Sequence, residues 1–356
     1  MNHRVLVVIL LSVFGLARYT EASIILSLDY THDTFIGTHT TARAALEAAA
    51  SDVGGAMSTW LTKISPGDNQ IAGTSGVTTA TFNWRYTYSQ PATGSSITIN
   101  TPDVAVDEIR IFVGVRNMSG GTLGIGSPNG AGYSFTGSGF PSDWVAAVAE
   151  AEMQVNTIHG RSGGPVMGSF SGNSTLGSAT AIYDLAYGFS YGSIAFDVDS
   201  DNNGMQDDFA TLDNYWHFDH TTPVMAGKND FYSVAVHELL HTLGVGTAEA
   251  WHDLASGTTW SGVEAIALNG GSGVGLITTD GHIANNLMSR RLLDGVLQEV
   301  VMDSNIIEGT RKSLTWMDLA FLRDIGWETI IPGPGVSVVL LVGMAMAMAR
   351  RGCQRS

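Results

Sequence analysis

The chain is poor in cysteine and in basic residues, and each shortage excludes a class of protein. Its 356 residues include one cysteine, Cys353, so no disulfide can form within the chain. Lys and Arg number 17 against 33 Asp and Glu, so we expect no nucleic acid partner and no binding to anionic lipid headgroups. Hydrophobic residues make up 44%, which is enough to build one large or two small cores.

The amino terminus lacks a hydrophobic run long enough to span a membrane. Arg4 precedes an apolar run from Val5 to Ala17, and Thr20 and Ala22 are small residues at the −3 and −1 positions of a cleavage before Ser23. The run falls short of the roughly 20 residues that span a bilayer. We therefore expect residues 1–22 to be a secretory signal peptide that is removed on export.

Residues 331–356 have the composition of a sorting tail. Pro332 and Pro334 precede an apolar run from Val336 to Ala349, which an arginine-rich end follows. The pattern resembles the Pro-Glu-Pro signals that bacterial exosortases recognise, with Gly333 where that family usually has Glu. The resemblance implies an exosortase-type processing enzyme as a partner, and the alternative is a simple tail anchor. In both cases the protein is exported, extracellular or at the cell surface, and touches a membrane only through this tail.

The chain between these two ends has the periodicities of an α+β protein. Apolar residues recur every three or four positions in two segments, which predicts helices at 41–64 and 143–153. Apolar and polar residues alternate in others, which predicts strands at 84–88, 97–99, 109–115 and 193–196. The Gly- and Ser-rich segment 117–139 predicts an excursion between elements, and Trp216-His217-Phe218 predicts an edge strand.

The motif with the clearest chemistry is His237-Glu238-Leu239-Leu240-His241. Asp230 can cap a helix that ends at Gly244, and His237 and His241 then project from one face with Cβ atoms about 6 Å apart. Two imidazoles at this spacing can hold one Zn²⁺ ion. Glu238 lies beside the first ligand but is turned from it, which suits a general base acting on a zinc-activated water.

The residues after this motif extend the pattern. Gly244 completes His-Glu-x-x-His-x-x-Gly, which resembles the metzincin clan of zinc endopeptidases, although Thr247 stands where matrixin-like members place the third histidine. The stretch from Gly246 to Trp251, followed by Asp280-Gly281-His282, is similar to secreted bacterial members of the matrixin-like and leishmanolysin-like type. That resemblance implies His282 as the third zinc ligand, with His252 as the alternative.

The last part of the chain, 298–327, resembles the closing segment of the same peptidases. There a methionine turn lies beneath the metal and a last helix begins at a Thr or Ser cap. The resemblance implies Met302 as the methionine of this turn, with Met288 as the alternative. Ordinary core packing would explain either methionine equally well.

The resemblance also implies a fold and its division. We expect a metzincin-like α+β catalytic domain with a mixed, twisted sheet, a backing helix, and an active-site helix above a cleft. Without internal repeats or an interdomain linker, residues 23–330 form one catalytic unit. Its upper part covers 23–246 and its irregular lower part 247–330.

An acidic segment upstream has the spacing of a calcium loop. Asp199, Asp201, Asn203 and Asp207 occupy positions 1, 3, 5 and 9 of an EF-hand-like loop with Gly204 at position 6. Position 12 is Ala210 rather than the bidentate Glu, so an acidic solvated turn is the alternative. An exported chain without disulfides favours bound Ca²⁺ as a source of stability.

Together these patterns predict a secreted or surface-sorted zinc endopeptidase that hydrolyses a protein or peptide substrate. His237, His241 and His282 hold the zinc, and Glu238 is the base. The alternative is a catalytically inactive surface or matrix binding protein with the same fold, since Thr247 and Ile283 depart from the family pattern. Hydrolysis of a non-protein amide is a third possibility.

Overall fold

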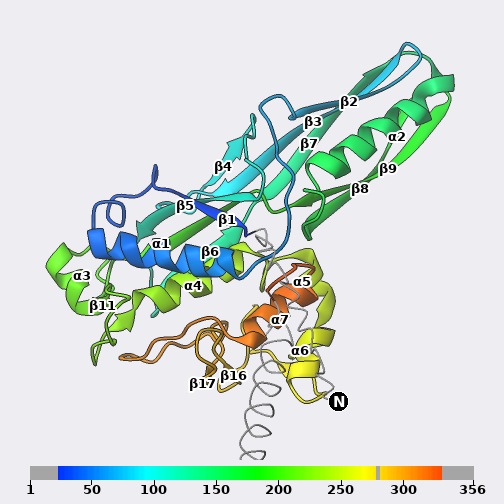
Figure 1. Ribbon diagram of the computed structural model, residues 1–356. Coiled ribbons are helices and arrows are strands. Elements are labelled where there is room, and N and C mark those ends of the chain that lie inside the picture. The colour runs from blue at the N-terminus through cyan, green and yellow to red at the C-terminus, as the bar shows by residue number, and fades with distance from the viewer. Residues whose placement is uncertain (1–22, 278–280, 331–356) are drawn as a thin grey trace, which may run out of the picture.

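The computed structural model describes residues 23–277 and 281–330, which fold into an α+β structure with several sheets (Figure 1). The predicted signal peptide, 1–22, and the predicted sorting tail, 331–356, lie outside the described residues. Among the described helices, none combines the length and the apolar character needed to cross a membrane.

A mixed four-stranded sheet forms the centre of the molecule. Its strands are ordered β1 (Ile25–Asp29), β5 (Glu108–Arg116), β10 (Tyr191–Asp197) and β6 (Gly124–Pro128). The first three are parallel, and β6 pairs with β10 in the antiparallel direction, with Ile194 opposite Gly126. The strand β6 therefore forms one edge of this sheet.

Two helices pack against each other on one face of this sheet (Figure 1). They are α1 (Thr40–Gly55), which also contacts β1, and α4 (Phe231–Thr242), which also contacts β6 and β10. The first ends earlier than the predicted helix 41–64. Near its end α1 lies very close to the chain before β1, because a Cβ on Gly54 would lie 2.2 Å from the carbonyl oxygen of Ile24. Met57 and Leu61 continue the apolar period because the segment after the helix packs into the same core.

A long arm projects from the other face of this sheet (Figure 1). It contains a sheet of β2 (Gln70–Ser75), β3 (Thr78–Ser89), β4 (Ser96–Ile99) and β7 (Gly130–Ser138), and a hairpin of β8 (Val166–Leu176) and β9 (Ala179–Gly188). Helix α2 (Pro141–Ile158) packs on β2, β3 and β9. This second core reaches Phe112 and Tyr191 of the central sheet, which joins the arm to it.

Polar side chains of α2 satisfy the backbone at two strand edges. Glu150 accepts a hydrogen bond from the N–H of Thr74 on β2, and Glu152 accepts one from the N–H of Asp184 on β9. Asn156 donates to the carbonyl of Asp184 and accepts from the N–H of Ala186. Since unpaired strand edges invite pairing with other chains, α2 both fills the core of the arm and protects its edges.

The prediction of an excursion at 117–139 is wrong, because this segment contains β6 and β7. Its glycines stand where strands lie very close to neighbouring elements. A Cβ on Gly137 would lie 2.2 Å from the Trp144 ring, and one on Gly126 would lie 2.1 Å from the Glu238 carbonyl oxygen. Glycine in this segment therefore reflects close packing rather than a loop.

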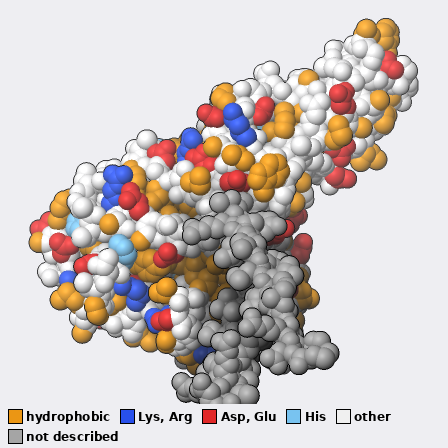
Figure 2. All heavy atoms as spheres, in the orientation of Figure 1, with side chains coloured by type: hydrophobic (Ala, Val, Ile, Leu, Met, Phe, Trp, Pro, Cys, Tyr) orange, Lys and Arg blue, Asp and Glu red, His pale blue; other side chains and the backbone are white. Residues whose placement is uncertain are grey.

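The other strand and helix predictions are confirmed within the described residues, with α2 longer than the predicted 143–153. The predicted edge strand is β11 (Trp216–His217), which follows α3 (Phe209–Tyr215) and pairs with β12 (Asn229–Asp230). The part after α4 has short elements: α5 (Glu249–Leu254), α6 (Val263–Leu268), α7 (Trp316–Asp324), β13 (Ala255–Ser256), β14 (Thr259–Trp260), β15 (Val274–Gly275), β16 (Met288–Arg290) and β17 (Leu297–Glu299). In Figure 2, acidic and hydrophobic side chains are scattered over the whole visible face, and the Lys and Arg side chains lie singly among them.

A buried histidine makes the arm sensitive to acid. His159 stacks on Trp84, its Nε2–H donates to the carbonyl of Asp68, and its Nδ1 accepts from the hydroxyl of Tyr86. Burial lowers the pKa of His159 to about 4. The unfolded chain, with a histidine pKa of about 6.5, binds the extra proton first, so the free energy of unfolding falls as the pH drops from about 6.5 towards 4.

Replacing this histidine should flatten that dependence. Both chains are compared without metal. Between pH 6.5 and 4.5, the loss of unfolding free energy in His159→Gln should be about 2–3 kcal/mol smaller than the loss in the parent. Urea unfolding at the two pH values measures this. His252→Gln, at an exposed histidine, is the control and should retain the parent slope. An equal slope in His159→Gln would show that His159 is not responsible.

Candidate metal centre

The helix α4 begins where the sequence predicts. The carboxylate of Asp230 caps it by accepting a hydrogen bond from the N–H of Ser233. The helix ends at Thr242, and Gly244 follows with a φ of 100°, a conformation that favours glycine. Within this helix, His237 and His241 lie four residues apart and therefore on the same face, as the spacing predicts.

Three histidines meet at this face of α4. Nε2 of His241 lies 3.1 Å from Nε2 of His237 and 3.4 Å from Nε2 of His282. One ligand atom from each of the three lies within 4.8 Å of the others. A tetrahedral Zn²⁺ ion with Zn–N bonds of about 2.0–2.1 Å needs nitrogens about 3.3–3.4 Å apart, so the donor type and the spacing fit zinc.

Backbone carbonyls orient two of the rings. Nδ1–H of His237 donates to the carbonyl of Val301 over 2.8 Å, and Nδ1–H of His241 donates to the carbonyl of Val245 over 2.7 Å. These bonds leave each Nε2 as the metal-binding nitrogen. Burial, with His241 nearby, lowers the pKa of His237 well below its usual range. A neutral imidazole, the form that binds metal, is thereby favoured.

The segment Val301–Met302 forms a buried support beside the cluster. Val301 contacts His237 as described, and the carbonyl of Met302 accepts a hydrogen bond from the N–H of Ile283, the residue after His282. Met302 is completely buried, whereas Met288, the alternative for the methionine turn, is 46% exposed on β16. The structure therefore places Met302, and not Met288, next to the histidines.

Asp318 holds this support in place, and the sequence analysis did not single it out. Its buried carboxylate accepts hydrogen bonds from the backbone N–H groups of Val301, Met302 and Thr315 and from the Thr315 hydroxyl. Thr315 and Asp318 also form the capping box of α7. The Thr-x-x-Asp spacing signals the cap, but nothing in the sequence signals the contact with Val301.

Glu238 lies on α4 against the edge strand β6 and is 5% exposed. Burial raises the pKa of Glu238 to about 8, and a backbone hydrogen bond from Gly126 acts in the opposite direction. A Cβ on Gly124 would lie 2.7 Å from Oε1 of Glu238. The two glycines of β6 therefore leave the room that this carboxylate occupies.

Adding a methyl group at this contact should disturb both the strand and Glu238. We expect Gly126→Ala to lower the free energy of unfolding by about 1–3 kcal/mol, because the new Cβ would overlap the Glu238 carbonyl oxygen. Urea unfolding measures the effect. Gly55→Ala is the matched control, since a Cβ at Gly55 meets no atom within 4 Å. Equal stability of the two variants would show that β6 does not depend on this glycine.

A cavity of about 610 Å³ opens beside the cluster. His237, Glu238 and His282 line one end, and Asn229 lines it just before the start of α4. The loop 120–124 and the segment 301–308 also line it. The histidine cluster and the buried carboxylate are thus accessible from a space large enough for a ligand.

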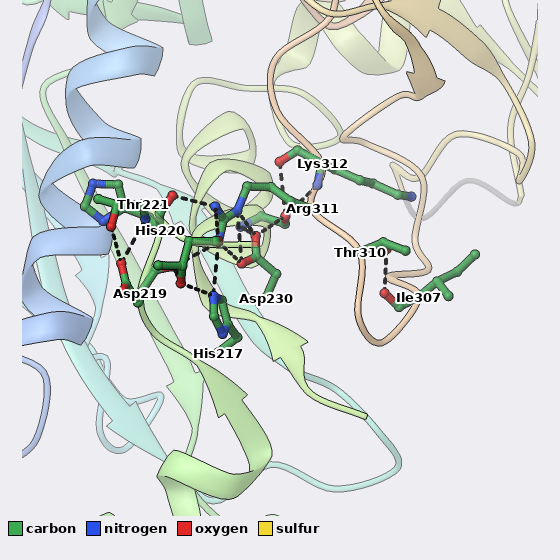
Figure 3. A network of polar contacts seen from close by, with 11 residues as sticks. His217, Asp219, His220, Thr221, Asp230, Ile307, Thr310, Arg311 and Lys312 are labelled. Carbon is green, nitrogen blue, oxygen red and sulfur yellow. Dashed lines mark hydrogen bonds and ion pairs between the residues drawn. The ribbon is translucent and has the colours of Figure 1, made fainter. Parts of the chain in front are cut away.

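A polar network fixes the amino end of α4 to the segment that ends in Lys312 (Figure 3). The guanidinium of Arg311 contacts both oxygens of Asp230 and donates to the carbonyls of Asp219, His220 and Thr222. The same Asp230 accepts from the hydroxyl of Ser233, which in turn accepts from the N–H of Lys312. This network ties the segment 219–222 to two segments that line the cavity, one at Asn229 and Ser233 and the other at Lys312.

The remaining predicted site residues lie elsewhere. His252 is exposed on α5 and is not in the cluster, which is the one group of its kind within the described residues. The carboxylates of Asp199 and Asp201 both accept from the N–H of Asn203. Asp199 accepts from the N–H groups of Asn203 and Gly204, and Asp207 from the N–H and hydroxyl of Ser200. Calcium binding stays a prediction, because these bonds explain the loop without an ion.

Comparison with protein-family models, with curated proteins and with solved structures gives no match for this chain. The metzincin resemblance therefore rests on the motifs of the sequence alone.

Proposed function

We propose that this protein is a zinc endopeptidase of the metzincin type. One observation carries the proposal: the imidazoles of His237, His241 and His282 converge beside the buried carboxylate of Glu238 at a cavity. A purely structural metal site would need no such carboxylate on the cavity side. The mixed sheet, α1, α4 and the position of Met302 are consistent with the metzincin fold that the sequence motifs predict.

His237, His241 and His282 would hold the ion through their Nε2 atoms. Bound zinc supplies a Lewis acid that acidifies water and polarises the carbonyl of the substrate. The positive charge of bound zinc would favour the ionised form of Glu238, against the burial that raises its pKa in the metal-free chain. The carboxylate of Glu238 then takes the proton of the attacking water and returns it to the leaving amine.

The edge of the central sheet supports a peptide as the substrate. The strand β6 ends the sheet order, and the cavity reaches the start of this strand at Gly124. An extended peptide can pair with a free strand edge through its backbone, which positions a peptide bond without specifying its sequence. This arrangement favours an endopeptidase over an enzyme that hydrolyses a small non-protein amide.

The proposed location follows from the two chain ends. Export through residues 1–22 and sorting through residues 331–356 by an exosortase-type enzyme would bring the domain to the cell surface. At the surface, the domain would act on proteins and peptides outside the cell.

Metal removal tests the proposal. The zinc-loaded chain should cleave casein, an unstructured protein, and the cleavage should stop with a zinc chelator and return with added Zn²⁺. A folded, zinc-loaded chain that leaves casein and short peptides intact would contradict the peptidase and favour the inactive binding protein.

A further inference from the structure

The cavity continues along α4 well beyond the histidine cluster. Ser233, Val234, His237 and Glu238 line it from one face of the helix, and Asn229 lines it just before the cap. Glu238 comes eight positions after Asp230, which corresponds to about 12 Å along a helix axis. A substrate group that fills the far end must therefore be long.

Asn229 provides an unused hydrogen-bonding group at this far end. It is 7% exposed and lines the cavity, and its backbone pairs with Trp216. Within the described part of the chain its side-chain amide takes part in no hydrogen bond. Because this amide lines the cavity and has no hydrogen-bond partner among the described residues, it can bind a ligand with hydrogen-bonding groups.

Tyr215 and Glu308 lie at the same end. The N–H of Gly309 donates to the carbonyl of Lys228, so the backbone beside Glu308 lies against the backbone beside Asn229. Glu308 is exposed and lines the cavity with Tyr215 and Asn229. Burial, with Asp197 and Glu308 nearby, raises the pKa of Tyr215 to about 12, so its hydroxyl keeps its proton and can donate or accept. The far end thus presents an amide, a phenol and a carboxylate.

The cations near the cavity are already paired. Lys312 lines it, but its Nζ lies 3.1 Å from Glu299 and 3.7 Å from Asp303, and donates to the carbonyl of Asn305. Lys228 donates to the carbonyl of Asp213 and does not line the cavity. Glu308, in contrast, forms no ion pair with the described residues. The far end therefore favours a positive charge on the ligand.

We propose that this end of the cavity, formed by Asn229, Tyr215 and Glu308, is a subsite for a Lys or Arg side chain next to the cleaved bond. The inference rests on the proposed endopeptidase function and names its substrate class. Glu308 pairs with the cationic end of the side chain, and the Asn229 side-chain oxygen and the Tyr215 hydroxyl accept its N–H groups. Lys and Arg are the residues that carry a positive charge at the end of a long side chain.

Cleavage mapping tests the subsite. Sites cut in casein are identified by mass spectrometry, and Lys or Arg should be enriched about tenfold over Leu at one residue flanking the cut. Glu308→Gln should reduce the enrichment several-fold, and Glu308→Lys should shift the preference to Asp and Glu. Asn229→Asp should strengthen the basic preference. Glu47→Lys, the same charge change at an exposed residue of α1, should leave the preference unchanged.

A binding measurement separates this inference from the proposed function. The zinc-loaded Glu238→Gln chain is titrated by calorimetry with three heptapeptides that differ in a central Arg, Leu or Glu. Tighter binding of the Arg peptide that is lost in the Glu238→Gln/Glu308→Lys chain supports the subsite, even if the parent hydrolyses nothing. If the chain hydrolyses peptides with a preference for Leu that the substitution at Glu308 does not change, the subsite is overturned and the peptidase is retained. If the chain neither hydrolyses nor binds these peptides, both the subsite and the peptidase are overturned.

Discussion

Glu238→Gln is expected to lower the rate of casein cleavage at least about 100-fold, while zinc binding persists. A positioned general base contributes roughly 10²–10⁴ in rate, and Gln has the shape of Glu but cannot take a proton at neutral pH. The three Nε2 atoms come from other residues, so the metal site should stay intact. Cleavage rate and zinc content, measured on the same preparation, give the result.

The fold should tolerate this substitution. Glu238 is buried, and the burial that raises its pKa to about 8 opposes its ionised form, so a neutral amide costs the fold little. Glu47→Gln, at a half-exposed carboxylate on α1, is the control and should keep full activity. Retained cleavage in Glu238→Gln would refute the role of Glu238, and lost zinc would show that it acts on the metal site instead.

Asp318→Asn is expected to be the most destabilising of the substitutions considered. The carboxylate accepts hydrogen bonds from the N–H of Val301 at 3.0 Å, from the N–H of Thr315 at 2.9 Å and from the Thr315 hydroxyl at 2.7 Å. An Asn side chain turns an NH₂ group towards some of these donors. Leaving buried donors unsatisfied should lower the free energy of unfolding by about 3–5 kcal/mol.

The same substitution should weaken zinc binding, although Asp318 does not contact the cluster. Val301 contacts His237, and partners behind a metal ligand contribute about 10–100-fold in affinity. Urea unfolding and competition with a zinc chelator measure the two effects. Asp213→Asn, at a carboxylate 56% exposed, removes an equal charge and should change neither. A stable Asp318→Asn chain with parent zinc affinity would contradict the supporting role of Asp318.

The sequence predicts the parts of the site that depend on local geometry. A spacing of four residues on a helix is enough to place His237 and His241 on one face, and Asp230 caps that helix as expected. The motif order, not a local rule, indicated His282, and the structure places it with the other two. The exposed position of His252 could not be inferred, because a histidine beside Trp251 in the sequence can point to either side of α5.

The parts of the site that the sequence could not predict depend on distant contacts. Val301 is 64 residues from His237, and Asp318 is 17 residues from Val301. Their hydrogen bonds involve backbone groups, which every residue carries, so no residue type signals them. The arm was missed for a similar reason. An alternating pattern defines the buried face of β3 and a period of three to four residues defines that of α2, but neither shows that the two pack on each other.

Zinc content tests the central claim most directly. Elemental analysis of the parent, His282→Ala and His252→Ala chains, each dialysed against the same zinc buffer, compares the two candidates for the third ligand. The account predicts one zinc per chain in the parent and in His252→Ala. In His282→Ala zinc should bind much more weakly, so that most of it is absent after dialysis. No zinc in the parent, or zinc that is lost with His252 and kept without His282, would contradict it.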